Sequence, residues 1–133
     1  MDVTNSARAA ALWIALNVIL LVVLSALVVR QRVTQKVMIG DGGSPELIRA
    51  GRAFGNATEY VPAALIAMVA LAMTNALPVL IHVVGAALFV GRIAHALGIS
   101  RTENASPGRL IGMVLTWSAI LTAAVALLLR AFA

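Results

Sequence analysis

Four long apolar segments, separated by short polar connections, constrain this chain more than any other feature. They cover about residues 9–29, 45–74, 78–97 and 107–129. A helix of about 20 apolar residues crosses the ~30 Å hydrocarbon core of a bilayer. The 133 residues are 62% hydrophobic, and their mean hydropathy is +1.00. A soluble domain of this size cannot bury so many apolar side chains. The sequence therefore predicts an all-α fold, an integral membrane four-helix bundle that forms one multi-pass domain over residues 1–133.

Local signals place the beginnings of these helices. Ser44 and Ser106 are good N-cap residues, and Pro45 and Pro107 suit the first helical position that follows each of them. The second segment would be about 45 Å long at 1.5 Å per residue, so part of it must lie outside the hydrocarbon or inside protein. Pro62 falls within it, removes one backbone hydrogen bond, and is expected to kink the helix.

The basic residues are distributed unevenly between the two ends of the predicted bundle. Only Arg8 and Arg130 fall on the side of the chain termini. The positive-inside rule places the side that is richer in basic residues in the cytoplasm, so both termini are expected outside it. Basic residues at helix ends fit a membrane surface better than nucleic acid, and the absence of cysteine excludes disulfides and thiolate metal sites. The other eight of the ten basic residues fall on the side of the two longer connections: Arg30, Arg32, Lys36, Arg49, Arg52, Arg92, Arg101 and Arg109.

A polar stripe enters the second apolar segment. Arg49, Arg52, Asn56 and Glu59 follow one another at spacings of 3, 4 and 3, which places them within an arc of about 80° on a helix. Arginines alone would suit a collar that extends to the membrane surface. An amide and a carboxylate on the same stripe do not suit a collar, and polar groups inside a membrane usually mark a site. A binding site is therefore the favoured interpretation.

These side chains have the chemistry of an anion receptor. Arginines bind carboxylates through paired hydrogen bonds, Glu59 can accept from an ammonium group, and Asn56 can both donate and accept. A ligand with separated carboxylates and one amine would satisfy them. Arg109, in the first turn of the last helix, adds its charge to the positive helix end, where a thiol supplied by a ligand would have a lowered pKa. This side chain is the candidate catalytic residue.

The pattern Arg52-Ala53-x-x-Asn56-x-x-Glu59-Tyr60-x-Pro62 resembles the second-helix signature of the MAPEG family, the membrane-associated proteins in eicosanoid and glutathione metabolism. The resemblance extends over nearly the whole chain, through its length, its four spans and the arginines near the helix ends. It implies a homotrimer of four-helix bundles, with glutathione as co-substrate between neighbouring subunits on the cytoplasmic side. No metal is implied.

The resemblance also assigns individual residues. It implies that Arg109 stabilises the glutathione thiolate. Two positions near the end of the third helix that carry aromatic hydroxyls in the eicosanoid enzymes are His95 and Ile99 here, and from the residues alone His95 is equally well a ligand contact or interfacial packing. The implied glutathione-binding residues are Arg30, Arg52, Asn56, Glu59, Tyr60, Arg92 and His95.

Two classes of function follow. The first is a membrane-bound glutathione transferase or peroxidase that acts on a lipophilic electrophile dissolved in the bilayer. The alternative is a non-enzymatic scaffold that binds lipid or glutathione, or a small transporter. The transporter is disfavoured because the first apolar segment contains no acidic residue. The expected partners are membrane lipid, a small lipophilic substrate and further copies of the chain, and nucleic acid is not expected.

Three weaker features complete the predictions. The pairs Gly51/Gly55 and Gly108/Gly112 have the spacing that permits close helix approach, although chance explains either pair about as well. Asn17, in the middle of the first span, is expected to form a hydrogen bond to another helix. Trp13, Trp117 and His82 are expected to anchor the chain at the membrane interface or to pack.

Overall fold

The computed structural model describes residues 3–102 and 104–132, so residues 1, 2, 103 and 133 of the expected domain lie outside the described residues. Within the described ranges the chain forms four α-helices and no strand, and each helix is long and apolar enough to cross a membrane. The predicted all-α, membrane-spanning fold is therefore confirmed. The helices are α1 (Val3–Gln35), α2 (Pro45–Met73), α3 (Pro78–Arg101) and α4 (Pro107–Ala131).

The capping signals located the helix starts well. The Ser44 hydroxyl accepts from the backbone N–H of Leu47, and the Ser106 hydroxyl accepts from that of Arg109, with proline at the first helical positions. The expected range 9–29 was too short for α1, which continues to Gln35, and α3 likewise passes residue 97. Hydropathy marks where the hydrocarbon ends, whereas a helix continues wherever its backbone hydrogen bonds are kept.

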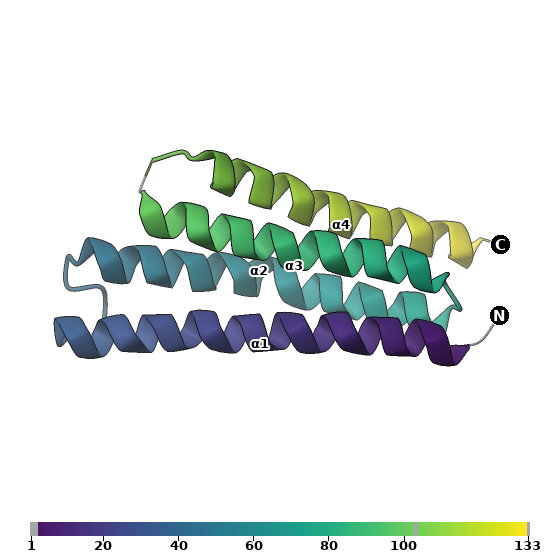
Figure 1. Ribbon diagram of the computed structural model, residues 1–133, viewed down its shortest axis with the longest axis horizontal. Helices are drawn as coiled ribbons and strands as arrows, with labels where there is room; N and C mark the ends of the chain where they lie inside the picture. The colour runs from purple at the N-terminus through teal and green to yellow at the C-terminus, as the bar shows by residue number, and fades with distance from the viewer. Residues whose placement is uncertain (1–2, 103, 133) are drawn as a thin grey trace.

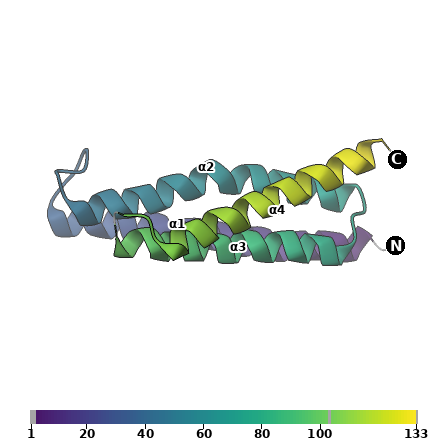
Figure 2. The ribbon, with the colours of Figure 1, turned by 90° about the horizontal axis from the view of Figure 1, so that it is seen from above.

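The helices are arranged around a central pair. Figure 1 shows α1 and α4 on opposite sides, with α2 and α3 between them, and no contact joins α1 to α4 among the described residues. Seen from above, α4 crosses α3 obliquely and approaches the end of α2 (Figure 2), where an Arg130 Nη1 donates to the Thr74 carbonyl at 3.0 Å. α1 and α4, on opposite sides of the central pair, therefore contribute to different parts of the molecular surface.

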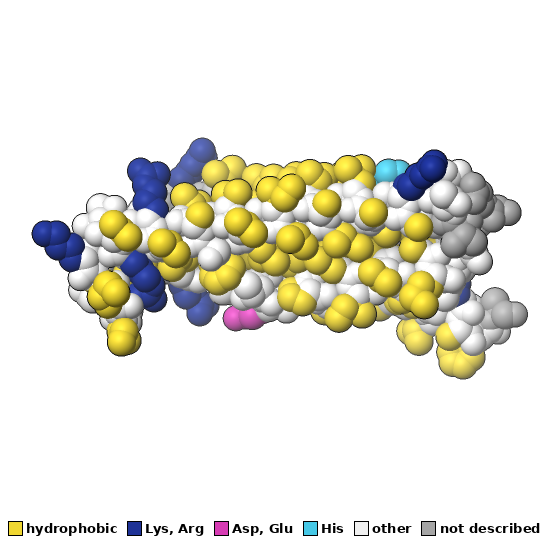
Figure 3. Space-filling model, turned by 90° about the horizontal axis from the view of Figure 1, so that it is seen from below, with side chains coloured by type: hydrophobic (Ala, Val, Ile, Leu, Met, Phe, Trp, Pro, Cys, Tyr) yellow, Lys and Arg dark blue, Asp and Glu magenta, His cyan; other side chains and the backbone are white. Residues whose placement is uncertain are grey.

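The surface divides into an apolar middle and a basic end. Figure 3 shows hydrophobic side chains over the central part of the molecule and most of the visible Lys and Arg side chains at one end. Both chain ends lie at the other end (Figure 1), as an even number of spans requires. This matches the predicted grouping of basic residues, whereas the side of the membrane on which the termini lie stays a prediction.

Glycine produces the closest helix contact. A Cβ built on Gly112 would lie 2.6 Å from the carbonyl oxygen of Gly91, so α3 and α4 approach at van der Waals contact through their backbones. The pair Gly108/Gly112 therefore does permit close helix packing. A Cβ placed on Gly51 or Gly55 would meet no atom within 4 Å, so that pair makes no such contact among the described residues. The hydrogen bond predicted from Asn17 to another helix is absent from the described residues: its amide nitrogen donates at 2.8 Å to the Trp13 carbonyl within α1, and its Oδ1 accepts from none of these residues.

Candidate functional site

The polar stripe of α2 is divided in the folded chain. Arg49 donates to Glu46 one turn earlier, with an Nη2–Oε1 distance of 3.2 Å. Arg52 and Glu59 are exposed, and neither side chain forms a hydrogen bond or an ion pair with any described residue. Because an uncompensated charge beside hydrocarbon is costly, these two side chains are the part of the stripe that is suited to contact something outside this chain.

Arg92 of α3 lies inside the bundle and links three helices. Its side chain is only 1% exposed. Its Nε donates to Thr116 Oγ1 of α4 at 2.8 Å, an Nη1 donates to Asn56 Oδ1 of α2 at 2.7 Å, and an Nη2 donates to the Gly112 carbonyl at 3.3 Å. The guanidinium carbon also lies 5.6 Å from the centre of the Tyr60 ring, within cation–π range.

The acceptors around Arg92 are neutral oxygens, the Met113 sulfur and an aromatic ring, with no carboxylate among the described contacts. A buried charge is tolerated only when its donors are well satisfied, so this network requires α2, α3 and α4 to keep a fixed relative rotation. The contact also orients Asn56. With its Oδ1 occupied by Arg92, the amide nitrogen of Asn56 is left as the donor towards a ligand.

Arg109 and His95 occupy the contact between α3 and α4 at the basic end. Arg109 Nη1 donates to the Asn104 carbonyl at 2.9 Å, and its own backbone N–H is capped by Ser106. His95 is 5% exposed and packs directly against Gly112, and its ring forms no hydrogen bond with the described residues. Of the two interpretations of His95, the packing role is the one whose contacts are present within a single chain.

Arg30 is not brought to the other candidate residues. It is exposed near the end of α1, and its guanidinium forms no hydrogen bond with the described residues; its carbonyl accepts from the Thr34 hydroxyl in addition to the backbone bonds of the helix. Arg52 instead borders a cleft of about 210 Å³ that Arg32 and Asp41 also line. Arg32 was not among the predicted site residues, although its position two residues after Arg30 was the available signal.

An apolar cleft of about 430 Å³ lies between α2 and α4 and begins at the polar stripe. Trp117, which was expected only to anchor or pack, borders this cleft. The hydroxyl of Thr116 was also missed, although a threonine one turn after Gly112 in an apolar helix was a usable signal. The cleft is lined by Glu59, Tyr60 and Ala63 of α2 and by Trp117, Ile120 and Leu121 of α4.

Comparison with known proteins identifies the family. The model of the MAPEG family matches residues 10–129. The chain belongs to the MAPEG family. It is 39% identical over 111 residues to "Inner membrane protein YecN" of Escherichia coli strain K12, over 84% of this chain and 83% of the relative, and equally similar to the protein of that name in Escherichia coli O6:H1. No solved structure matches this chain. The inner-membrane relative and the four spans together support an integral membrane, multi-pass protein.

The MAPEG chain has its predicted glutathione-binding residues at the basic end, but in two different environments. Arg52, Glu59 and Arg30 face outward, whereas Arg92 and His95 are buried. Ile99 is 6% exposed and packs in the core of the basic end. As an isoleucine, it offers no hydroxyl to a ligand. The assignment of these residues to glutathione stays a prediction.

Proposed function

We propose that this MAPEG protein is a membrane-bound, glutathione-dependent transferase or peroxidase that acts on a lipophilic electrophile. One observation carries the proposal: Glu59 belongs both to the outward-facing polar stripe and to the lining of the apolar cleft of about 430 Å³. A polar co-substrate on the stripe and an apolar molecule in the cleft would therefore be neighbours. Such proximity is the first requirement for a reaction between two bound molecules.

The outward-facing side chains fit the functional groups of glutathione. Its two carboxylates suit Arg52 and the Arg30 of a neighbouring subunit, and its ammonium group suits Glu59. The amide nitrogen that Arg92 leaves available on Asn56 suits a peptide carbonyl. Binding would also neutralise Arg52 and Glu59, whose charges have no partner among the described residues.

The family resemblance implies a co-substrate between the subunits of a homotrimer, and the arrangement of the helices supports this part of the proposal. Arg30 lies near the end of α1 and Arg109 near the start of α4, and α1 and α4 do not pack against each other within the described chain. A second subunit that brings its α4 beside α1 would let one ligand meet both arginines without spanning α2 and α3. Native mass spectrometry in mild detergent tests the assembly, because a stable monomer would leave no intersubunit site.

Arg109 is the proposed catalytic residue. Its guanidinium, added to the positive N-terminal end of α4, would stabilise a thiolate and increase its abundance at neutral pH. In the transferase reaction the thiolate sulfur attacks the electrophilic carbon, a carbon–sulfur bond forms, and the leaving group departs with the bonding electron pair. The thiol proton passes to water. In a peroxidase reaction two thiols would reduce a lipid hydroperoxide to an alcohol and water, and would form one disulfide.

Arg92 has a different role in this proposal. Because its guanidinium is buried and already donates to Thr116, Asn56 and Gly112, it acts as a positioning residue for Asn56 and not as a direct ligand contact. We assign the direct contacts to the residues that face outward.

Two substitutions separate binding from activation. Arg52→Ala removes a paired carboxylate contact and is expected to weaken glutathione binding by about 1.5–3 kcal/mol, or roughly tenfold to a hundredfold in titration calorimetry. Arg109→Ala is expected to leave the affinity nearly unchanged and to reduce conjugation to an activated aryl chloride most strongly near neutral pH. If glutathione at millimolar concentration does not bind to the wild type, the proposal fails in both its parts.

The second candidate is a scaffold that binds glutathione or lipid without chemistry. The buried Ile99, at a position where the eicosanoid enzymes carry an aromatic hydroxyl, favours it. The thiolate of bound glutathione absorbs in the ultraviolet, so a difference spectrum distinguishes the two candidates. Binding without thiolate absorbance, and without turnover of any electrophile, would leave only the scaffold.

A further inference from the structure

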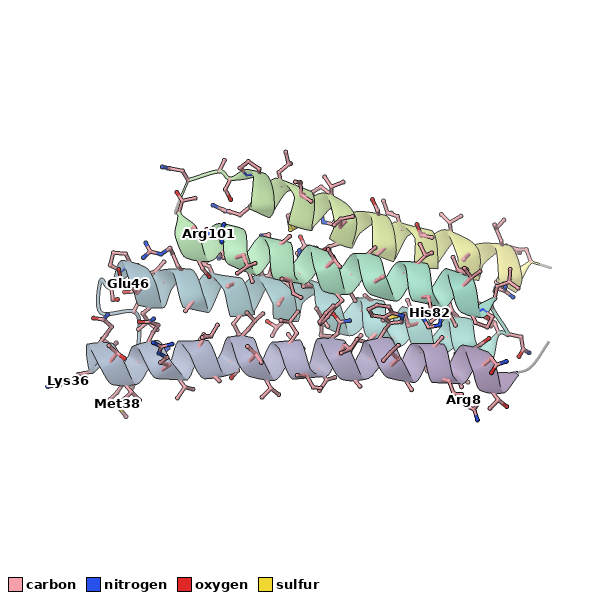
Figure 4. All side chains as sticks on the ribbon, in the orientation of Figure 1. Arg8, Lys36, Met38, Glu46, His82 and Arg101 are labelled. Atoms are coloured by element: carbon pink, nitrogen blue, oxygen red, sulfur yellow. The ribbon has the colours of Figure 1, made fainter. Side chains whose placement is uncertain are left out.

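The outer side of α1 carries a further cleft, at the basic end of the molecule. Its volume is about 580 Å³, and it runs along the last two turns of α1 into the loop that follows. Figure 4 shows Lys36 and Met38 projecting from this end, with Met38 on the side of α1 away from the other helices. We call it the α1 cleft, and it is lined by Val29, Arg32, Val33, Lys36, Val37 and Met38.

The loop beside the α1 cleft is tied to α1 through Arg32. An Nη1 of Arg32 donates to the carbonyls of Val37, Met38 and Gly40 at 3.5, 3.3 and 2.9 Å. The loop leaves Met38 88% and Ile39 92% exposed. Apolar side chains fixed in that position are unfavourable in water, but they are suited to the boundary between lipid head groups and acyl chains.

Lys36 has a backbone conformation that its side chain does not favour. Its φ is +55°, and α1 ends there in a Schellman motif, with Val37 N–H donating to the Arg32 carbonyl at 3.0 Å. Glycine is the preferred residue at this position, because a Cβ is strained at positive φ. The lysine side chain is exposed and bonded to no described residue. A locally unfavourable residue of this kind indicates that the ammonium group itself has a use.

An apolar stripe leads from the middle of α1 to this cleft. Val18, Val22, Val29 and Val33 are all exposed, and their positions fall within an arc of about 60° on the helix. Val22 to Val33 spans about 16 Å, close to half the hydrocarbon thickness. The face of α1 in Figure 3 shows the same gradation, from hydrophobic side chains in the middle to basic ones at the end.

We propose that the α1 cleft binds an anionic phospholipid of the adjacent leaflet. The phosphate would lie between Lys36 and the outer edge of Arg32, and the upper part of an acyl chain would lie along Val29 and Val33. A second copy of the chain is the poorer occupant of this cleft, because most of the charged side chains that it would bring to this end are basic and would not neutralise Lys36. A lipid phosphate supplies the opposite charge.

The test uses the full-length protein in mild detergent, titrated with phosphatidylglycerol or with phosphatidylcholine that has the same acyl chains. Bound lipids are counted by native mass spectrometry. We expect phosphatidylglycerol to bind at least fivefold more tightly. Lys36→Gly should lower that affinity about fivefold, the usual effect of one basic residue near a lipid surface, and should leave the phosphatidylcholine affinity unchanged. Glycine suits φ +55°, so this variant should melt no earlier than the wild type.

The matched control is Arg8→Gln, which removes an exposed basic residue at the opposite end of the same helix. It should keep the affinity for phosphatidylglycerol within twofold. Equal binding of the two lipids, or an equal loss in the two variants, overturns the proposal. Displacement of phosphatidylglycerol by millimolar inorganic phosphate would identify a site for free phosphate instead, and loss of subunits from the Lys36→Gly protein would identify a neighbouring copy as the occupant.

Discussion

Gly112→Ala is the substitution with the clearest structural consequence. The added methyl group would lie 2.6 Å from the Gly91 carbonyl oxygen and 2.6 Å from both the Cβ and the backbone nitrogen of His95. Non-bonded carbon atoms normally approach to about 3.5–4 Å. The alanine therefore fits only if α3 and α4 separate locally by about 1 Å.

This separation acts on two terms of the unfolding free energy. Inserting a methyl group into a closed contact costs about 1–3 kcal/mol. The helices would also move apart at the hydrogen bonds that Arg92 donates to Thr116 and to the Gly112 carbonyl, and weakening one bond to a charged group costs about another 1 kcal/mol. We expect Gly112→Ala to lower the free energy of unfolding by about 2–4 kcal/mol.

The control is Gly55→Ala on α2, where a built Cβ meets no atom within 4 Å. Alanine is a better helix former than glycine, so this variant should be unchanged or more stable by up to about 1 kcal/mol. Both variants can be measured by titration with sodium dodecyl sulfate in mixed micelles, followed by far-UV circular dichroism. Equal changes in the two variants would refute the reasoning, because the glycine contact between α3 and α4 would then have no energetic weight.

Two further predictions concern the Arg92 network and the orientation. Thr116→Val removes the acceptor of Arg92 Nε and should lower the unfolding free energy by about 1–3 kcal/mol, whereas Thr34→Val, on an exposed threonine, should change it by less than about 0.5 kcal/mol in the same titration. A reporter fused to the C-terminus should be active if it is of the periplasmic type and silent if it is of the cytoplasmic type, since the basic residues gather at the other end. The reverse pattern would move the proposed glutathione site to the non-cytoplasmic side.

The candidate site shows where a one-helix pattern fails. Arg49, Arg52, Asn56 and Glu59 were correctly placed near one another on α2, but an arc of about 80° is wide enough to meet several different surroundings. Arg49 pairs with Glu46, Asn56 meets Arg92, and Glu59 borders the apolar cleft. Which surroundings each residue meets depends on how α2 is rotated against α3 and α4, and helical spacing carries no information about that rotation.

The class of fold, the four spans and the starts of α2 and α4 could be predicted from the sequence alone. These depend on local quantities: the transfer of each segment into hydrocarbon, and the caps of Ser44 and Ser106, which act within three residues. Only the packing of the helices shows that Arg92 is buried, that Gly112 closes the contact between α3 and α4, and that Glu59 and Trp117 line the same cleft. Arg92 is 36 residues from Asn56 and 24 from Thr116. Contacts of that range arise only when whole helices pack, because their stability comes from the joint fit of several surfaces.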